Sequence, residues 1–235
     1  MTSIEALINR QILKWETEKK LSSESQRIPE RPVMPVVTIS RQSGSRGSYF
    51  GSRLAQRLGY QRLHRDAIDA ICTSSGYVKR IVESLDDHHR SELALMVEGL
   101  FSGQMVDHAD YFRHLYQVVL SMSRLGGVVL MGRGGNFILG PHHGFHLRVI
   151  CPHQQRIENL IRYRSLSAKD AKDQIEKSDA ERRQFISRLF KADIDDPHHY
   201  DLIINTSLMD VEDIVEMAAV ALRAKMSKLS HLDND

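Results

Sequence analysis

The stretch that most constrains the fold of this chain runs from Met34 to Leu63. It begins with an apolar run at 36–39, Val-Val-Thr-Ile, which predicts a buried strand. The small residues of 43–48, Ser-Gly-Ser-Arg-Gly-Ser, follow as a loop, and an amphipathic helix comes next. A strand, a glycine-bearing loop and a helix in this order can cradle phosphate, because the amides at the helix N-terminus and the helix dipole both favour an anion. The segment therefore predicts a phosphate site within an α/β fold.

The loop departs from the standard P-loop, G-x-x-x-x-G-K-[ST], at two informative positions. Arg41 stands where that motif has its first glycine, and Gly47 stands where it has lysine. Ser48 occupies the position of the hydroxyl that binds magnesium. We expect Arg46 to supply the missing positive charge, with a reach and a planar shape that differ from those of lysine. The residues expected to bind phosphate are Arg41, Gly44, Ser45, Arg46, Gly47 and Ser48.

Composition places the chain among ordinary globular proteins. Hydrophobic residues make up 41% of the 235 residues, which is enough for a sizeable core and argues against disorder. The net charge of +2 gives no general indication of nucleic-acid binding. The sequence contains no secretory signal and no apolar run long enough to cross a bilayer, so we expect a cytoplasmic protein that does not bind membranes.

The remaining sequence predicts alternating strands and helices. Short β-branched runs at 127–131, 146–150 and 201–205 predict strands, and charged helices are expected between the last two. This alternation indicates a parallel sheet with helices on both faces, in which ligands bind beyond the carboxyl ends of the strands. An amphipathic helix at 4–20 and a polar linker precede the core. The expected division is 1–33 for helix and linker, 34–228 for the core domain and 229–235 for a polar tail. The first helix is expected to pack on the domain surface or on a second copy, which would make a homo-oligomer, rather than to bind a dedicated partner.

Four motifs, taken in order, resemble the cytidylate-kinase-like family of P-loop nucleoside monophosphate kinases. They are T-I-S-R-x-x-G-S-x-G from Thr38, G-R-G-x-N from Gly132, an Asp- and Arg-rich helix, and Y-D-L-I-I-N-T-S from Tyr200. The resemblance covers about 36–222. It implies a P-loop NTPase-type, doubly wound parallel sheet with a helical lid, the N-terminal helix being an extension. It also implies phosphoryl transfer from ATP to a nucleoside monophosphate with Mg²⁺, and Ser48 as the metal ligand.

The resemblance also assigns roles to individual residues. Arg133 matches the arginine of the family's G-R-D segment, which contacts the substrate monophosphate, whereas Gly134 replaces the carboxylate of that segment and weakens the case for cytosine preference. Arg65 and Asp66 fall where the monophosphate-binding helix begins, so they are expected at the acceptor. The lid is expected to contain Asp179, Arg182 and Arg183, and the catalytic residues are expected to be Arg46, Arg182 and Arg183.

Three functions remain open from the sequence. The first is ATP-dependent phosphorylation of a nucleoside monophosphate, CMP-like, or of a similar small phosphate acceptor. The second is a nucleotide-binding regulatory protein with weak or no kinase activity, because the loop lysine and the G-R-D carboxylate are absent. The third, nucleic-acid binding, is the weakest, because basic and aromatic residues do not alternate. The arginines at positions 156, 162 and 164 are expected to face solvent.

Overall fold

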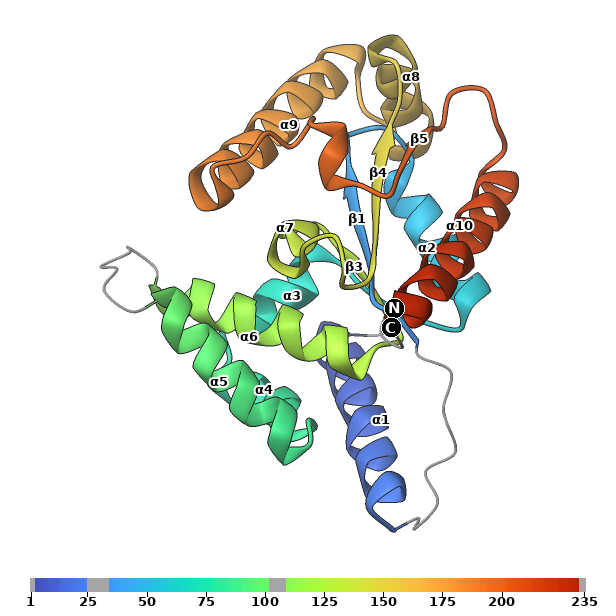
Figure 1. Ribbon diagram of the computed structural model, residues 1–235. Coiled ribbons are helices and arrows are strands. Elements are labelled where there is room, and N and C mark those ends of the chain that lie inside the picture. The colour runs from blue at the N-terminus through green and yellow to red at the C-terminus, as the bar shows by residue number, and fades with distance from the viewer. Residues whose placement is uncertain (1–2, 25–33, 102–108, 233–235) are drawn as a thin grey trace. The chain divides into compact units, whose positions relative to one another are not determined.

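The computed structural model describes residues 3–24, 34–101 and 109–232 (Figure 1). The chain groups into two compact units. The first contains residues up to 36 together with 63–128, and the second contains 37–62 together with the chain from 129 onward. The phosphate loop, residues 42–48, belongs to the second unit. The division of the sequence into 1–33, 34–228 and 229–235 stays a prediction.

A five-stranded sheet organises the second unit. Its strands are β1 (Val37–Arg41), β2 (Gln61–Leu63), β3 (Val128–Met131), β4 (Phe145–Ile150) and β5 (Leu202–Asn205), arranged in the order β2-β3-β1-β4-β5. β1 pairs in parallel with both β3 and β4, and β4 pairs in parallel with β5. The chain leaves the central strand toward both edges of the sheet, so the carboxyl end of β1 is the point where an open α/β sheet binds its ligand.

One face of the sheet packs against α2 (Gly47–Leu58) and α10 (Val211–Leu232), which lie side by side in Figure 1. Phe50 and Leu54 of α2 and Ile214 of α10 are at most 1% exposed and pack against alternate residues of β1 and β4. Alternate strand residues point to one face, as the period of two requires. The buried face of α2 thus fixes the direction in which the phosphate loop leaves β1.

On the opposite face of the sheet, the buried polar side chains of β1 and β4 form hydrogen bonds within the protein. α7 (Gly135–Leu139) approaches β1 so closely that a Cβ on Gly135 would lie 3.1 Å from Thr38 Cγ2. The Thr38 hydroxyl is 2.8 Å from His146 Nδ1, and His146 Nε2 is 2.8 Å from the Gly140 carbonyl oxygen. The carbonyl can only accept, so Nε2 carries the proton and Nδ1 accepts from Thr38. Burial lowers the pKa of His146, which keeps the ring neutral in this role.

Two further helices complete the second unit. α8 (His153–Arg164) and α9 (Ala168–Phe190) pack through a small apolar cluster that contains Ile157, Leu160 and Ile175. A short 3₁₀ helix at Pro197–His199 begins with Asp196, whose side chain accepts from the His198 amide, and leads into β5. α8 and α9 carry the side chains that hold the phosphate loop.

The first unit is helical. It consists of α1 (Ile4–Glu24), α3 (Arg65–Cys72), α4 (Ser75–Glu83), α5 (Asp87–Phe101) and α6 (Ala109–Leu125). α1 buries Ile8, Ile12 and Trp15, each at most 2% exposed, and the Trp15 indole donates to the Gly126 carbonyl. In the described ranges, none of the helices combines the length and the apolar character that crossing a membrane requires.

The predicted strands are confirmed within one or two residues at each end. The sequence did not predict β2, because its residues Gln-Arg-Leu are few and mostly polar. The helix expected at 4–20 continues to Glu24, and the C-terminal helix extends through residues 229–232 of the predicted tail. The rest of the predicted linker, 25–33, lies outside the described residues.

Candidate functional site

The phosphate loop turns sharply between β1 and α2 with two residues in the left-handed region. Gly44 has a φ of +77° and Arg46 a φ of +58°. A Cβ on Gly44 would lie 2.6 Å from the Arg156 carbonyl oxygen, so only glycine fits there. Alternation of ordinary and left-handed residues forms a concave nest of amides, which is typical of anion sites.

Five consecutive carbonyl oxygens, from 41 to 45, each accept a hydrogen bond from a side chain. Within the loop, the Ser45 hydroxyl donates to the Gln42 oxygen at 2.8 Å. The other four donors come from outside the loop. In order of the carbonyl that they bind, they are Arg182 to residue 41 (3.0 Å), Arg156 to 43 (3.3 Å), Asn159 to 44 (2.9 Å) and Thr206 to 45 (2.8 Å).

This arrangement directs loop amides away from those side chains. In a trans peptide the N–H points opposite to the carbonyl of the same peptide unit. Because the carbonyls of residues 43 and 45 are bound by Arg156 and Thr206, the amides of Gly44 and Arg46 face the other way. The backbone amides of Gly44, Arg46 and Ser48 donate to no protein atom in the described part of the chain. The loop therefore presents free donors to a ligand, as an oxyanion or phosphate site must.

A buried ion pair anchors this loop to α8 and α9. Asp179 accepts from the Ser43 amide at 2.8 Å and from Arg182 at 3.0 Å through one oxygen, and from Arg156 at 2.5 Å through the other. The side chains of Arg156 and Asp179 are 9% and 11% exposed. Each charge needs the other, because an unpaired charge at this depth costs several kcal/mol. The expectation that Arg156 faces solvent is therefore wrong, whereas Arg162 and Arg164 are exposed as predicted.

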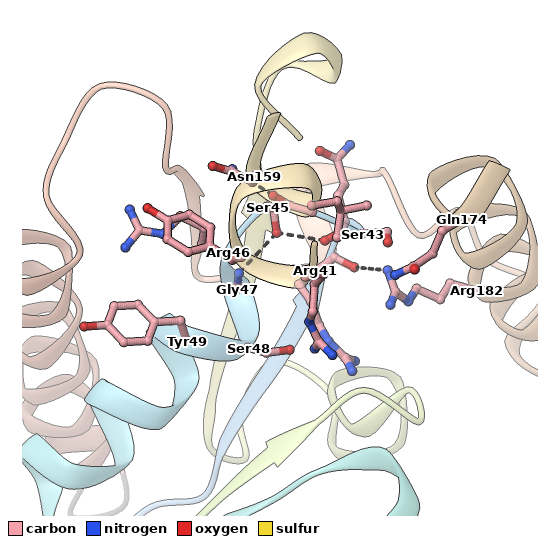
Figure 2. A pocket seen from close by; sticks show the side chains of 15 residues that line it. Arg41, Ser43, Ser45, Arg46, Gly47, Ser48, Tyr49, Asn159, Gln174 and Arg182 are labelled. Carbon is pink, nitrogen blue, oxygen red and sulfur yellow. Dashed lines mark hydrogen bonds between the residues drawn. The ribbon is translucent and has the colours of Figure 1, made fainter. Parts of the chain in front are cut away.

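The loop opens into a cavity of about 480 Å³, shown in Figure 2. Its walls are the phosphate loop, Arg41 and Tyr49 on one side, and residues of α8 and α9 on the other. None of the residues that line it carries a carboxylate, whereas four are arginines: Arg41, Arg46, Arg164 and Arg182. A concave site lined by one sign of charge concentrates ligands of the opposite sign. The cavity therefore suits a compact, highly charged anion.

Arg46 directs its charge toward two tyrosines. Its guanidinium carbon lies 5.3 Å from the ring centre of Tyr49 and 5.2 Å from that of Tyr163. Both distances fall in the range of cation–π attraction. Tyr49 and Tyr163 are half exposed at the cavity wall. Arg46 thus lines the cavity at its aromatic end, and its role in phosphate binding stays a prediction.

A second arginine cluster lies beside the loop, where β4 ends. Arg148 has a side chain only 6% exposed, donates to Ser40 at 2.7 Å and pairs with Asp195 at 2.5 Å. Arg183 approaches the other oxygen of Asp195 at 4.0 Å. A small pocket joins this cluster to Arg41 and Arg182. Positively charged side chains therefore extend from the phosphate loop to the carboxyl end of β4, where Arg148 lies.

Arg133 lies at the end of β3, next to β1. It adopts a φ of +56°, and its guanidinium carbon lies 5.3 Å from the ring centre of Phe185 in α9. A Cβ on Gly134 would lie 2.3 Å from Phe190, so the space that a carboxylate would need there is filled by an aromatic ring. Phe190 in turn stacks on Phe137, with ring centres 5.2 Å apart. A carboxylate side chain at position 134 would therefore clash with Phe190 in this chain.

The structure brings together most of the residues that the sequence singles out. The loop residues, Arg41, Asp179 and Arg182 form one connected cluster, and Arg183 is its exposed neighbour. The segment expected to be a lid is part of α9, whose Asp179 is buried beneath the loop. Arg65 and Asp66 begin α3 in the first unit, where they form an exposed pair, and their role at the acceptor stays a prediction.

Of the three serines that line the cavity, only Ser48 is exposed, so its hydroxyl is the one that could bind magnesium there. Its side chain is exposed in the first turn of α2 and lines the cavity. Asp179 is engaged by three donors, so its oxygens are already used. Mg²⁺ prefers oxygen ligands and usually keeps several waters beside substrate phosphates. The site fits an ion held by the Ser48 hydroxyl and by the phosphates of a nucleotide.

Several residues of the site escaped sequence reasoning. Arg148, Arg156, Asn159 and Asp195 lie on three different segments, and only the fold brings them together. Thr206 is different, because it follows a predicted strand and was therefore expected at the ligand edge of the sheet, although without a partner there. A buried arginine in a charged helix such as α8 gives no such signal.

Comparison with known proteins agrees with this geometry. The model of the cytidylate kinase-like family matches residues 36–208. A cytidylate kinase from Ignicoccus hospitalis is 25% identical over 183 residues, covering 78% of this chain and 96% of that protein. A uronate isomerase from Corynebacterium glutamicum is 34% identical over 92 residues, 39% of this chain, and the match spans only 18% of that protein's length.

A crystal structure of an uncharacterized protein from Eubacterium ventriosum has a similar fold. It aligns with a TM-score of 0.55 at 14% identity, covering 80% of this chain and 98% of that one. The family match includes β1, the phosphate loop, all residues that bind its carbonyls, and Arg133. The chain belongs to the cytidylate kinase-like family.

Proposed function

We propose that this protein transfers the terminal phosphoryl group of Mg-ATP to a nucleoside monophosphate, CMP or a close relative, or to a similar small phosphate acceptor. The observation that carries the proposal is the phosphate loop itself. Its carbonyls are bound from behind, and its free amides open into a cavity lined by four arginines and no carboxylate. The family's kinase character and the cytidylate kinase relative support the choice of reaction and acceptor.

Phosphoryl transfer of this kind requires little covalent participation by the protein. An oxygen of the acceptor phosphate attacks the γ-phosphorus, the bond from that phosphorus to the β,γ-bridging oxygen breaks, and ADP leaves with the electron pair. Catalysis then depends on position and on neutralising charge on the transferring group. The loop amides would hold the donor phosphates, Arg182 and Arg183 would neutralise the transferred group, and Arg133 would bind the acceptor phosphate. Magnesium at Ser48 would screen the phosphate charges.

A coupled assay of ADP release from Mg-ATP tests this function against a panel of nucleoside monophosphates. We expect ADP release that depends on one acceptor, with CMP the first candidate. Arg133→Ala should lower kcat/KM for that acceptor by about 10²–10³-fold, because it removes a charged contact to the acceptor phosphate. Arg188→Ala removes an exposed arginine of α9 and serves as the matched control, with turnover expected within twofold of the wild type.

A regulatory protein that binds nucleotide is the second candidate. It is favoured by Gly47 at the lysine position and by Phe190 in the space of the missing carboxylate. Such a protein would bind Mg-ATP without consuming it in the presence of any acceptor. Acceptor-independent ADP release, or none at all, would refute the kinase proposal for the acceptors tried.

A further inference from the structure

We propose that Arg41, and not Arg46, takes the place of the missing P-loop lysine. The inference rests on the proposed function, since it names the residue that would supply the cation in phosphoryl transfer. In the sequence, arginine stands where the P-loop has its first glycine and glycine stands where it has lysine. The structure shows that these two departures compensate each other in space.

The first observation is the close approach of Arg41 to Gly47, two residues that line the cavity and are labelled in Figure 2. A Cβ on Gly47 would lie 2.7 Å from Arg41 Cβ and 3.2 Å from Arg41 Cγ. The space that a side chain at position 47 would enter is therefore filled by the stem of Arg41. A lysine at 47 and an arginine at 41 exclude each other.

The second observation comes from the end of β3. Gly132 donates its amide to the Ile39 carbonyl, and a Cβ on Gly132 would lie 2.6 Å from Arg41 Nη1. The guanidinium of Arg41 thus lies against the backbone just before Arg133. Two glycines, 47 and 132, leave room for the same side chain, one beside its stem and one beside its charged end.

The backbone of Arg41 is held firmly. Arg41 is the last residue of β1, pairs with Val149 of β4, and its carbonyl accepts from Arg182 at 3.0 Å. Its side chain lines both the main cavity and the small pocket beside Arg148. A rigid strand end therefore carries the charge from the donor phosphate loop toward Arg133, the residue assigned to the acceptor. The transferred phosphoryl group must lie between those two sites.

Arg46 is less suited to that role. Its guanidinium is near Tyr49 and Tyr163, at the aromatic end of the cavity. Lysine in a P-loop acts on the β- and γ-phosphates. Arg41 comes from the strand before the loop, and its stem fills the space beside Gly47 in which the side chain of that lysine would begin.

Exchange of the two residues tests the inference. Arg41→Met keeps most of the stem and removes the charge, and should lower turnover with Mg-ATP and the best acceptor by about 10²–10³-fold. Gly47→Lys alone should be equally poor, because its stem meets Arg41. The double variant, Arg41→Gly with Gly47→Lys, places the first glycine and the lysine of the standard motif, while Arg46 stays at its second glycine. It should recover at least tenfold over Arg41→Met. Arg46→Ala tests the rival residue and should lose less activity than Arg41→Met, whereas Arg188→Ala is the control and should stay within twofold of the wild type.

Two results would overturn the inference. One is an Arg41→Met protein whose turnover stays within threefold of the wild type. The other is a double variant no better than Arg41→Met, with circular dichroism showing that both fold. If the wild type turns over no acceptor, the proposed kinase function fails, and Mg-ATP affinity then decides the role of Arg41. We expect Arg41→Met to bind at least tenfold more weakly, and equal affinity would contradict that role.

Discussion

Replacing Asp179 with alanine is expected to destabilise the second unit by about 3–5 kcal/mol and to abolish nucleotide binding. The substitution leaves Arg156 with a buried charge and no counter-ion, which is the costly half of breaking a buried ion pair. It also removes the acceptor of the Ser43 amide and one partner of Arg182. Urea unfolding followed by circular dichroism measures the loss, and Mg-ATP binding is titrated on the folded fraction.

Two further variants test whether the effect of Asp179→Ala comes from the loss of its ion pair with Arg156. Glu181→Ala removes an exposed acidic residue two positions along α9 and should change the unfolding free energy by less than about 0.5 kcal/mol. The double variant Asp179→Leu with Arg156→Met replaces both charges by apolar groups and should be more stable than Asp179→Ala. An Asp179→Ala protein as stable as the wild type would show that the pair does not anchor the loop.

Replacing Trp15 with alanine is expected to destabilise the first unit by about 3–5 kcal/mol. The indole is 2% exposed and hydrogen-bonded to the Gly126 carbonyl, so truncation leaves a large cavity beneath α1 and an unpaired acceptor. Lys19 strengthens the same attachment by donating to the Glu83 and Leu85 carbonyls, both at 2.6 Å. Thermal unfolding followed by far-ultraviolet circular dichroism measures the change without relying on the single tryptophan.

The control lies on the other face of the same helix. Leu13 is 60% exposed, and Leu13→Ala should change the unfolding free energy by less than about 0.5 kcal/mol. If Trp15→Ala were as mild as Leu13→Ala, α1 would be a loosely attached appendage. The packing of Ile8 and Ile12 favours the first outcome.

An element could be predicted from the sequence where a short stretch of neighbouring residues carries its pattern. β1, β3, β4 and β5 were predicted because each is an apolar, β-branched run, and the phosphate loop because small residues separate a strand from an amphipathic helix. β2 has three mostly polar residues and gives no such signal. The parallel sheet followed from the alternation of strands and helices.

The missed features all depend on contacts that are distant in the sequence. Arg156 looks like any helix charge until Asp179, 23 residues later, is brought beneath it. Arg41 and Gly47 are individually departures from a motif, and their complementarity appears only in space. The sequence led to Arg46 as the substitute cation because it is the nearest charge along the chain, whereas the fold places it beside two tyrosines.

Calorimetric titration of the wild-type protein with Mg-ATP tests the central claim most directly, because the whole account depends on the phosphate loop binding a nucleoside triphosphate. The predicted result is binding of one nucleotide per chain, competed by inorganic triphosphate and weakened at least tenfold by Arg41→Met but not by Arg188→Ala. Absence of binding at millimolar Mg-ATP, by calorimetry and by displacement of a fluorescent nucleotide, would contradict the account.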